Sequence, residues 1–263
     1  MRTSILRPRR RAAALVPVVG AIAALGLGPA ATAAPVAVPL CNGQPADLVV
    51  PPGGEWFSGT AADEVIVGTD GPDRIAGLGG DDTICSLGGN DTVRGETFSS
   101  NGTITGDDVI DGGYGDDRLY GDRGHDDVHG SFDDDRVYGG SSLSSGNGTD
   151  LMTGGAGDDV MYGSASDGDE IWGNSGEDFL AGGGGNDKIY GGPDADEIIG
   201  NFGNDIIRVG SGADTARGDY GNDDLGSVDG VNGNDSLDGR GPYVNSGVDT
   251  CDADPGDIVV NCT

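Results

Sequence analysis

Aspartates recur every nine residues in the stretch 182–208, which reads GGGGNDKIYGGPDADEIIGNFGNDIIR. Asp187, Asp196 and Asp205 mark this period, and an isoleucine follows each of them two positions later. Only Lys188 and Arg208 contribute positive charge in this stretch. Carboxylates repeated so regularly, with so few protein cations beside them, predict a site that takes its positive charge from solution.

The same nine-residue unit runs through most of the chain. The consensus unit has Gly at position 1, often Gly at position 4, an acidic residue at position 6 and an aliphatic residue at position 8. Of 19 units, 18 carry Asp at position 6, and Glu64 occupies that position in the first unit. Position 8 is aliphatic in 17 units, with Ala216 and Cys251 as the exceptions. Spacers at 95–102 and 139–144 interrupt the series, and degenerate units at 230 and 244 finish it. Chance periodicity is excluded, and residues 59–252 form one repeat region.

A nine-residue period suits a short strand followed by a turn. We expect a three-residue strand with one inward aliphatic side chain, then a six-residue glycine-rich turn, so that two units complete one coil of a flattened solenoid. Side chains alternate along a strand, so positions 7 and 9 should point outward while position 8 stacks inside as a thin core. The Asp should then lie in the turn with its carboxylate facing the loop of the next coil.

Counting through the spacers places the aspartates in two ladders. Stacked coils lie about 4.8 Å apart, and two bare carboxylates at that distance repel each other by about 3.5 kcal/mol at an effective dielectric constant of 20. Carboxylates combined with the carbonyls of glycine turns suit a hard cation with a large, flexible coordination shell, which is Ca²⁺ before Mg²⁺. The predicted calcium ligands are Asp82, Asp108, Asp126, Asp150, Asp169, Asp187, Asp205, Asp223 and Asp249 in one ladder, and Asp73, Asp91, Asp117, Asp135, Asp159, Asp178, Asp196, Asp214 and Asp235 in the other.

Three units, 112–120, 154–162 and 182–190, match the nonapeptide GGxGxDxUx in full. In this they resemble the RTX, or haemolysin-type, calcium-binding repeats. The resemblance covers about residues 59–252 and implies an all-β fold, a right-handed parallel β-roll. It also implies that Ca²⁺ is held between neighbouring loops by the Asp carboxylate and by backbone carbonyls. Most units here lack the second Gly, and Asp133 and Asp194 replace the Gly at position 4.

The N-terminus predicts export from the cell. An arginine-rich segment, an apolar alanine-rich run over 12–27 and small residues at Ala31 and Ala33 are typical of a signal peptide, which we assign to residues 1–34. Whether this leader is general secretory or twin-arginine stays open. The apolar run is short for a membrane span, so we expect a secreted, extracellular protein with no transmembrane segment after signal removal. Because the open ends of a solenoid expose strand edges, we expect an N-terminal cap over 35–58 and a C-terminal cap or tail over 253–263.

Export makes the four cysteines interpretable, since disulfides form in oxidising compartments. Four cysteines allow three connectivities. Their positions favour Cys41 with Cys85 and Cys251 with Cys262, as clamps at the two ends of the repeats. No CxxC spacing is present, which disfavours a zinc site.

Composition narrows the function. The formal net charge of −31, from 45 acidic and 14 basic residues, repels nucleic acid and anionic membranes and attracts cations. The HExxH, GxSxG and P-loop signatures are absent, which predicts no enzyme activity. The leading hypothesis is a non-enzymatic structural or adhesive module that folds on binding Ca²⁺, with extracellular polysaccharide or cell-surface components as candidate partners. The alternative is a module that binds polysaccharide or accompanies a polysaccharide-modifying enzyme.

Aromatic side chains recur at position 9 of successive coils. Tyr120, Tyr138 and Tyr162 fall on one face, and Trp172 and Tyr190 fall on the other. We interpret these columns as cross-strand stacking that stabilises short strands. A platform for carbohydrate binding is the alternative interpretation.

Overall fold

The computed structural model describes residues 38–96, 105–140, 148–227, 230, 234–240 and 248–262. The predicted signal peptide lies outside these residues. Residues 38–263 form one compact unit. The described residues form strands and turns, and none of them belongs to a helix that could cross a membrane.

Nearly all strands belong to two parallel sheets of eleven strands each. The odd sheet contains β3 (Leu48–Val49), β5 (Val65–Thr69), β7 (Thr83–Leu87), β9 (Val109–Tyr114), β11 (Asp127–Phe132), β13 (Leu151–Ala156), β15 (Glu170–Ser175), β17 (Lys188–Pro193), β19 (Ile206–Ser211), β21 (Asp224–Gly226) and β23 (Thr250–Asp252). The even sheet contains β4 (Trp56–Ser58), β6 (Arg74–Leu78), β8 (Thr92–Glu96), β10 (Arg118–Asp122), β12 (Arg136–Gly140), β14 (Val160–Tyr162), β16 (Phe179–Gly184), β18 (Glu197–Phe202), β20 (Thr215–Tyr220), β22 (Ser236–Asp238) and β24 (Ile258–Val260). A small antiparallel hairpin of β1 (Leu40–Cys41) and β2 (Gln44–Pro45) precedes them.

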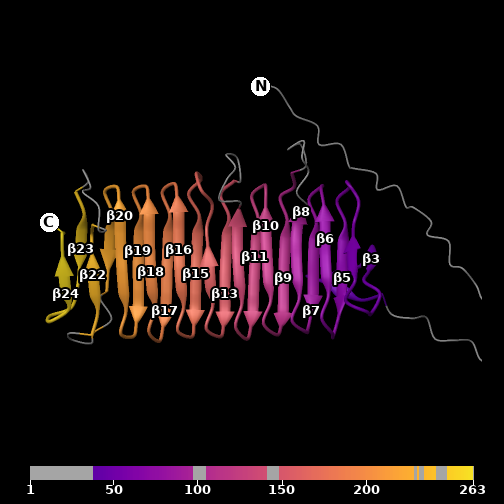
Figure 1. The fold of residues 1–263 in the computed structure, drawn as a ribbon, viewed down its shortest axis with the longest axis horizontal. Coiled ribbons are helices and arrows are strands. Elements are labelled where there is room, and N and C mark those ends of the chain that lie inside the picture. Colours follow the sequence, from indigo (N-terminus) through magenta and orange to yellow (C-terminus); the bar gives the residue numbers. More distant parts are fainter. Residues whose placement is uncertain are drawn as a thin grey trace, which may run out of the picture. The chain divides into compact units, whose positions relative to one another are not determined.

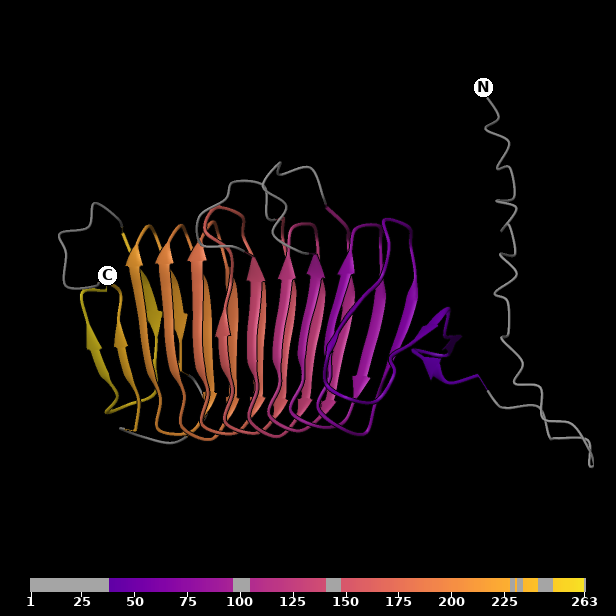
Figure 2. The ribbon, with the colours of Figure 1, turned by 45° about the vertical axis from the view of Figure 1, so that its right-hand side comes forward.

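Each strand pairs in parallel with the strand two places later in the sequence. Ile189 of β17, for example, lies opposite Ile207 of β19, one coil of 18 residues further on. The strands therefore follow one another along the sequence in two facing layers, as Figures 1 and 2 show. The predicted all-β class and parallel β-roll of nonapeptide repeats, with two units to a coil, are confirmed.

The predicted division into a three-residue strand and a six-residue turn was wrong. Strand β17 has six residues and covers positions 7, 8 and 9 of one unit and positions 1, 2 and 3 of the next. The reason is that the glycine-rich positions continue the ladder, which leaves only positions 4 to 6 for the turn. Position 2 often has positive φ even when it is not glycine, as at Leu78 (φ 91°) and Asn201 (φ 75°). Side chains at position 8 and residues at position 1 consequently both face inward.

A single aliphatic core runs between the sheets. The position 8 side chains are 0–1% exposed from Ile66 to Leu237 and form one continuous cluster. Ala216 is the smallest member of this cluster, and Val209, at position 1 of the same unit, adds a second inward aliphatic side chain there. The core is one or two side chains thick, so burial of apolar area is spread evenly along the coils instead of being concentrated at a centre.

Both sheets extend past the predicted repeat limits. Strands β3 and β4 pair with β5 and β6, so part of the segment expected to form an N-terminal cap supplies the first coil. Strand β24 pairs with β22, and it lies within the segment expected to be a tail. The predicted disulfides Cys41–Cys85 and Cys251–Cys262 are confirmed, with Cα atoms 5.6 and 5.8 Å apart.

The predicted aromatic columns are also confirmed. Tyr120 stacks on Tyr138 with ring centroids 4.8 Å apart, and Tyr138 stacks on Tyr162 at 5.4 Å. On the odd sheet, Trp172 and Tyr190 stack at 3.9 Å. Two further stacked pairs at position 3, Tyr114 with Phe132 and Phe202 with Tyr220, were not predicted.

Candidate metal centre

All eighteen predicted aspartates are buried, with 0–3% of each residue exposed. Each immediately precedes a strand, so the nine-residue period fixes its place at the edge where the chain passes between the two sheets. The structure places them in the two ladders predicted from the sequence, because hydrogen bonds join successive aspartates within each ladder.

One oxygen of each carboxylate builds the ladder, except at Asp73, which begins the second ladder and contributes its backbone N–H. Asp169 N–H donates to Asp187 Oδ1 (2.8 Å), and Asp187 N–H donates to Asp205 Oδ1 (2.9 Å). This bond recurs without a break from Glu64 to Asp249 along one edge and from Asp73 to Asp235 along the other. The expectation that each carboxylate faces the next coil was therefore wrong, since its Oδ1 bonds the backbone of the preceding coil.

We call each position 6 aspartate of a ladder a rung. In most rungs the second carboxylate oxygen, Oδ2, is buried without a hydrogen-bond donor. This holds for Asp82, Asp108, Asp117, Asp126, Asp135, Asp150, Asp159, Asp178, Asp187, Asp196, Asp205 and Asp223. A buried polar atom with no partner costs about 1–3 kcal/mol, and more when the group is charged. Repeated along both ladders, this cost indicates that a positively charged partner or a proton belongs beside each Oδ2.

The glycine at position 1 leaves the space for such a partner. A Cβ placed on Gly182 would overlap Asp187 Oδ2 of the same unit and lie 2.9 Å from Gly200 O of the next coil. The same two kinds of oxygen converge on Gly112, Gly154, Gly173 and Gly200. We call this oxygen-lined space, between the position 6 carboxylate and the position 1 carbonyl of the next coil, the cradle. Position 1 requires glycine in these units because a Cβ there would come too close to these two oxygens, and not because the residue has a positive φ.

Burial also raises the pKa values of many of these carboxyl groups, including those of Asp187 and Asp126. Desolvation raises the pKa of Asp187 to about 8, with a smaller contribution from the charges of Asp205 and Asp169, while the backbone hydrogen bond from Asp169 opposes the shift. The pKa of Asp126 is raised to about 9 for the same leading reason. A carboxyl group with such a pKa is ionised at neutral pH only if a cation compensates its charge.

The oxygens present fit Ca²⁺. In the described part of the chain, no three His, Cys, Asp or Glu side chains come together, so a cation here would have to combine carboxylate oxygens with backbone carbonyls. The cradle offers both kinds, from two coils at once. All-oxygen sets of this kind suit Ca²⁺, whereas zinc sites draw on Cys and His.

Some rungs carry a partner from the protein, which sequence reasoning missed. Ser86 occupies position 1 of its unit, is fully buried, and donates from Oγ to Gly112 O (2.8 Å), which fills the cradle beside Asp91. Burial raises the pKa of Asp91 to about 7, and hydrogen bonds from the Asp73 backbone and the Ser86 side chain oppose this rise. At Asp73, the Thr69 N–H and hydroxyl both donate to Oδ2 (2.6 and 3.0 Å).

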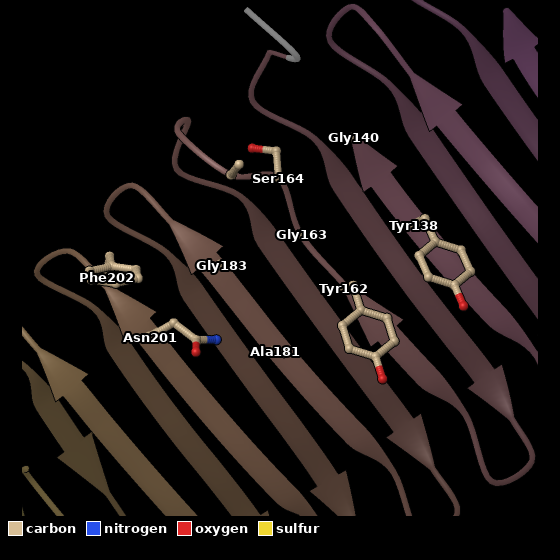
Figure 3. Close-up of a pocket in the computed structure, with 10 residues that line it drawn as sticks. Tyr138, Gly140, Tyr162, Gly163, Ser164, Ala181, Gly183, Asn201 and Phe202 are labelled. Carbon is tan, nitrogen blue, oxygen red and sulfur yellow. The ribbon is translucent and has the colours of Figure 1, made fainter. Parts of the chain in front are cut away.

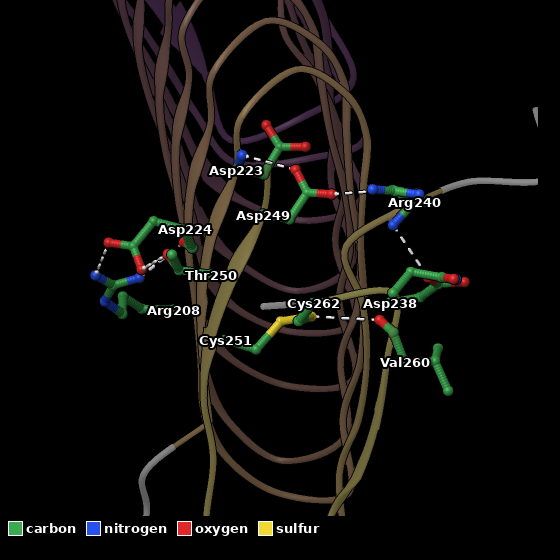
Figure 4. Close-up of a disulfide and its surroundings, with 11 residues drawn as sticks. Arg208, Asp223, Asp224, Asp238, Arg240, Asp249, Thr250, Cys251, Val260 and Cys262 are labelled. Atoms are coloured by element: carbon green, nitrogen blue, oxygen red, sulfur yellow. Dashed lines mark hydrogen bonds and ion pairs between the residues drawn. A yellow bond between two sulfur atoms is a disulfide. The ribbon is translucent and has the colours of Figure 1, made fainter. Parts of the chain in front are cut away.

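Two rungs near the C-terminus differ in another way. Val209 places a buried aliphatic side chain at position 1 of the unit that contains Asp214. At Asp249 the partner is a cation, since Arg240 Nε lies 3.8 Å from its Oδ2 (Figure 4). The same figure shows the Cys251–Cys262 disulfide beside this rung.

Asp257 extends the second ladder and was not among the predicted ligands. Asp235 N–H donates to its Oδ1 (3.4 Å), while Asp254 N–H and Ser227 Oγ donate to its Oδ2 (2.9 and 3.0 Å). The signal that could have found it is the sequence Asp257-Ile258-Val259, which repeats the spacing of acid and aliphatic residue. It comes eight residues after Asp249 instead of nine, because the turn that precedes it is one residue short.

Comparison with protein families identifies most of the repeat region. The family model, described as the RTX calcium-binding nonapeptide repeat (four copies), matches five segments: residues 58–93, 104–137, 144–167, 166–198 and 199–237. A comparison with curated proteins found no relative that matches the chain.

Proposed function

This chain belongs to the RTX calcium-binding repeat family, and from that premise we propose that it is a secreted, non-enzymatic structural or adhesive module whose roll forms when Ca²⁺ occupies the cradles. The proposed ligands are the eighteen position 6 aspartates together with position 1 carbonyls. The bound cation would neutralise carboxylates that burial otherwise forces to hold protons.

This proposal rests on the buried Oδ2 atoms that recur without a donor along both ladders. At neutral pH, a metal-free roll would have to hold two columns of carboxyl groups either protonated or charged without compensation, and each choice opposes folding. The thin core offers little to offset that cost, because each coil buries only two aliphatic side chains at position 8. Folding of the roll is therefore expected to depend on Ca²⁺.

Secretion is supported by three features. The two disulfides suit an oxidising compartment, the first 34 residues have the pattern of a signal peptide, and Ca²⁺ is abundant enough outside cells to occupy sites with dissociation constants of about 10⁻⁴ to 10⁻³ M, as in extracellular modules. The non-enzymatic role is supported by the equivalence of the rungs, since a carboxylate pair repeated along both edges does not single out one catalytic site.

A calcium titration followed by circular dichroism tests the proposal. In excess chelator at pH 7.5 the mature chain should lack most of its β signal, and added Ca²⁺ should restore it with a midpoint of about 10⁻⁴ to 10⁻³ M. Mg²⁺ at the same concentration is the control and should not restore the signal, because Mg²⁺ requires a tighter octahedral shell. A β signal in chelator equal to that in Ca²⁺ would refute the proposal.

A further inference from the structure

The outer face of the even sheet carries a groove of about 530 Å³. The rings of Tyr138 and Tyr162 lie along one side of it, with their hydroxyl groups pointing the same way, and Asn201 and Phe202 lie along the other (Figure 3). This volume falls in the range of small-molecule sites, which are mostly apolar with a few polar groups that fix orientation.

The groove exists because the column of stacked tyrosines ends at Tyr162, which meets the tilted ring of Phe179 on β16 at 5.7 Å, and because small residues follow on that strand. Along the even sheet, position 9 runs from Arg94, which lies 4.0 Å over the Tyr120 ring, through Tyr138 to Tyr162. The residue opposite Tyr162 on β16 is Ala181. Three glycines then follow, so from Ala181 onward β16 presents no side chain larger than a methyl group. The floor of the groove is therefore formed by backbone atoms of β16 and by the methyl group of Ala181.

The second wall comes from an independent stack. Phe202, on β18, is 61% exposed and stacks on Tyr220 at 4.8 Å. Tyr162 and Phe202 are separated by two strand spacings across the sheet and by three residues along it, which corresponds to about 14 Å on the diagonal. Two aromatic platforms at this separation suit an extended ligand made of several linked rings.

The chemistry of the lining identifies the ligand class. The groove offers aromatic ring surface, two phenolic hydroxyls and the Asn201 amide, and its described lining contains no Lys, Arg, Asp, Glu or His. The Ser164 hydroxyl is engaged locally with the backbone of Asp167 and leaves these three groups as the polar side-chain contacts. Aromatic rings bind the apolar C–H faces of sugar rings, while amide and hydroxyl groups bind their hydroxyls.

We propose that this groove binds a neutral oligosaccharide segment of an extracellular polysaccharide, stacked on Tyr162 and Phe202 and hydrogen bonded by Asn201. Charge supports a neutral ligand, because the lining lacks a cation that could hold an acidic sugar and the chain carries a net charge of −31. The groove depends on the proposed calcium function only through the folded state of the roll.

Affinity gel electrophoresis of the full mature chain in saturating Ca²⁺ tests this proposal. The gels would contain dextran, amylose, mixed-linkage glucan, galactomannan or anionic alginate. At least one neutral polysaccharide should retard the protein, and alginate should not. Tyr162→Ala should weaken the retardation about tenfold, because it removes one stacking platform.

A second variant distinguishes loss of sugar binding from loss of the folded state. Ala181→Tyr should continue the tyrosine column into the groove, so it should abolish retardation while leaving the calcium-induced β signal intact. Tyr114→Ala is the matched control, since it removes an exposed stacked ring (63% exposed) from the odd sheet, outside the groove, and should bind as the wild type does.

The proposal is overturned if no neutral polysaccharide retards the folded wild type, if alginate alone does so, or if Ala181→Tyr binds as tightly as the wild type. Circular dichroism of every variant in Ca²⁺ separates this failure from failure of the calcium function. A folded protein that does not bind sugar refutes the groove alone.

Discussion

Substituting Gly182 by Ala would close a single cradle and leave every carboxylate in place. The new Cβ would overlap Asp187 Oδ2 and lie 2.9 Å from Gly200 O, so both oxygens that line the cradle would be displaced. Because Gly182 does not have a positive φ, the alanine backbone itself is not strained. We expect the variant to bind fewer Ca²⁺ ions than the wild type and to unfold at a lower temperature.

The size of the effect follows from two contributions. At a free Ca²⁺ concentration ten times the dissociation constant, one lost site reduces the free energy of unfolding by about 1.4 kcal/mol. Overlap of a methyl group with packed atoms adds about 1–3 kcal/mol. A total of about 2–4 kcal/mol lowers the melting temperature of a domain of this size by about 5–15 °C.

Two matched variants make the measurement specific. Gly71→Ala is the control, because its Cβ would meet nothing nearer than 3.9 Å and its φ is not positive. Ser86→Gly is the converse change, since it removes the hydroxyl that fills the cradle beside Asp91 and should increase the number of bound ions. Equilibrium dialysis with atomic absorption counts the Ca²⁺ ions, and calorimetry gives the melting temperatures. If Gly182→Ala and Gly71→Ala bind as much Ca²⁺ as the wild type and melt together, the cradle is not where the ion binds.

Two further predictions concern pH and coupling between rungs. Because burial raises the folded-state pKa of rungs such as Asp187 and Asp135 to about 8, above the ordinary value of about 3.9, the metal-free roll is most stable below pH 4 and loses that stability as pH rises through 8. The β signal in chelator should therefore be larger at pH 5 than at pH 8.5, and the reverse order would contradict the raised pKa values. Asp187→Ala should raise the calcium midpoint more than Asp249→Ala, because Asp187 bonds the coils on both sides while Asp249 lies at a terminal rung beside Arg240; equal shifts in parallel titrations at one salt concentration would indicate independent sites.

The ladders could be predicted from sequence because their spacing allows one register. A strict alternation of Asp and aliphatic residue, two positions apart in a nine-residue period, leaves a single way to bury every aliphatic side chain. The spacers do not disturb this register, since Gly95 and Gly139 remain in strands and pack against Asp108 and Asp150. The disulfides and the aromatic columns followed from the same count.

Features that depend on contacts between coils could not be predicted in this way. The cradle at Gly182 is completed by the carbonyl of Gly200, 18 residues away, and the sequence of the nine-residue unit alone does not show that this atom lies there. Strand length was misjudged because residues such as Leu78 take a positive φ that their type disfavours. The groove beside Tyr162 required knowing that the small residues of β16 fall between two aromatic stacks.

The rungs that carry their own partner lie mainly toward the two ends of the described roll. Thr69 and Ser86 act near the N-terminal disulfide, and Arg240 acts toward the C-terminal one. Val209, also toward the C-terminus, is no partner for a carboxylate but occupies position 1 of its unit with a buried aliphatic side chain. Between the two ends, the rungs from Asp108 to Asp205 have no donor at Oδ2 apart from Asp169, to which Ser164 N–H donates (2.6 Å). The ends are thus held by covalent bonds and by protein groups, whereas the central rungs have few protein partners. If the proposed sites hold, we expect fewer Ca²⁺ ions than aspartates to be bound, and we expect the order of the central coils, which also form the aromatic groove, to depend most on the calcium concentration.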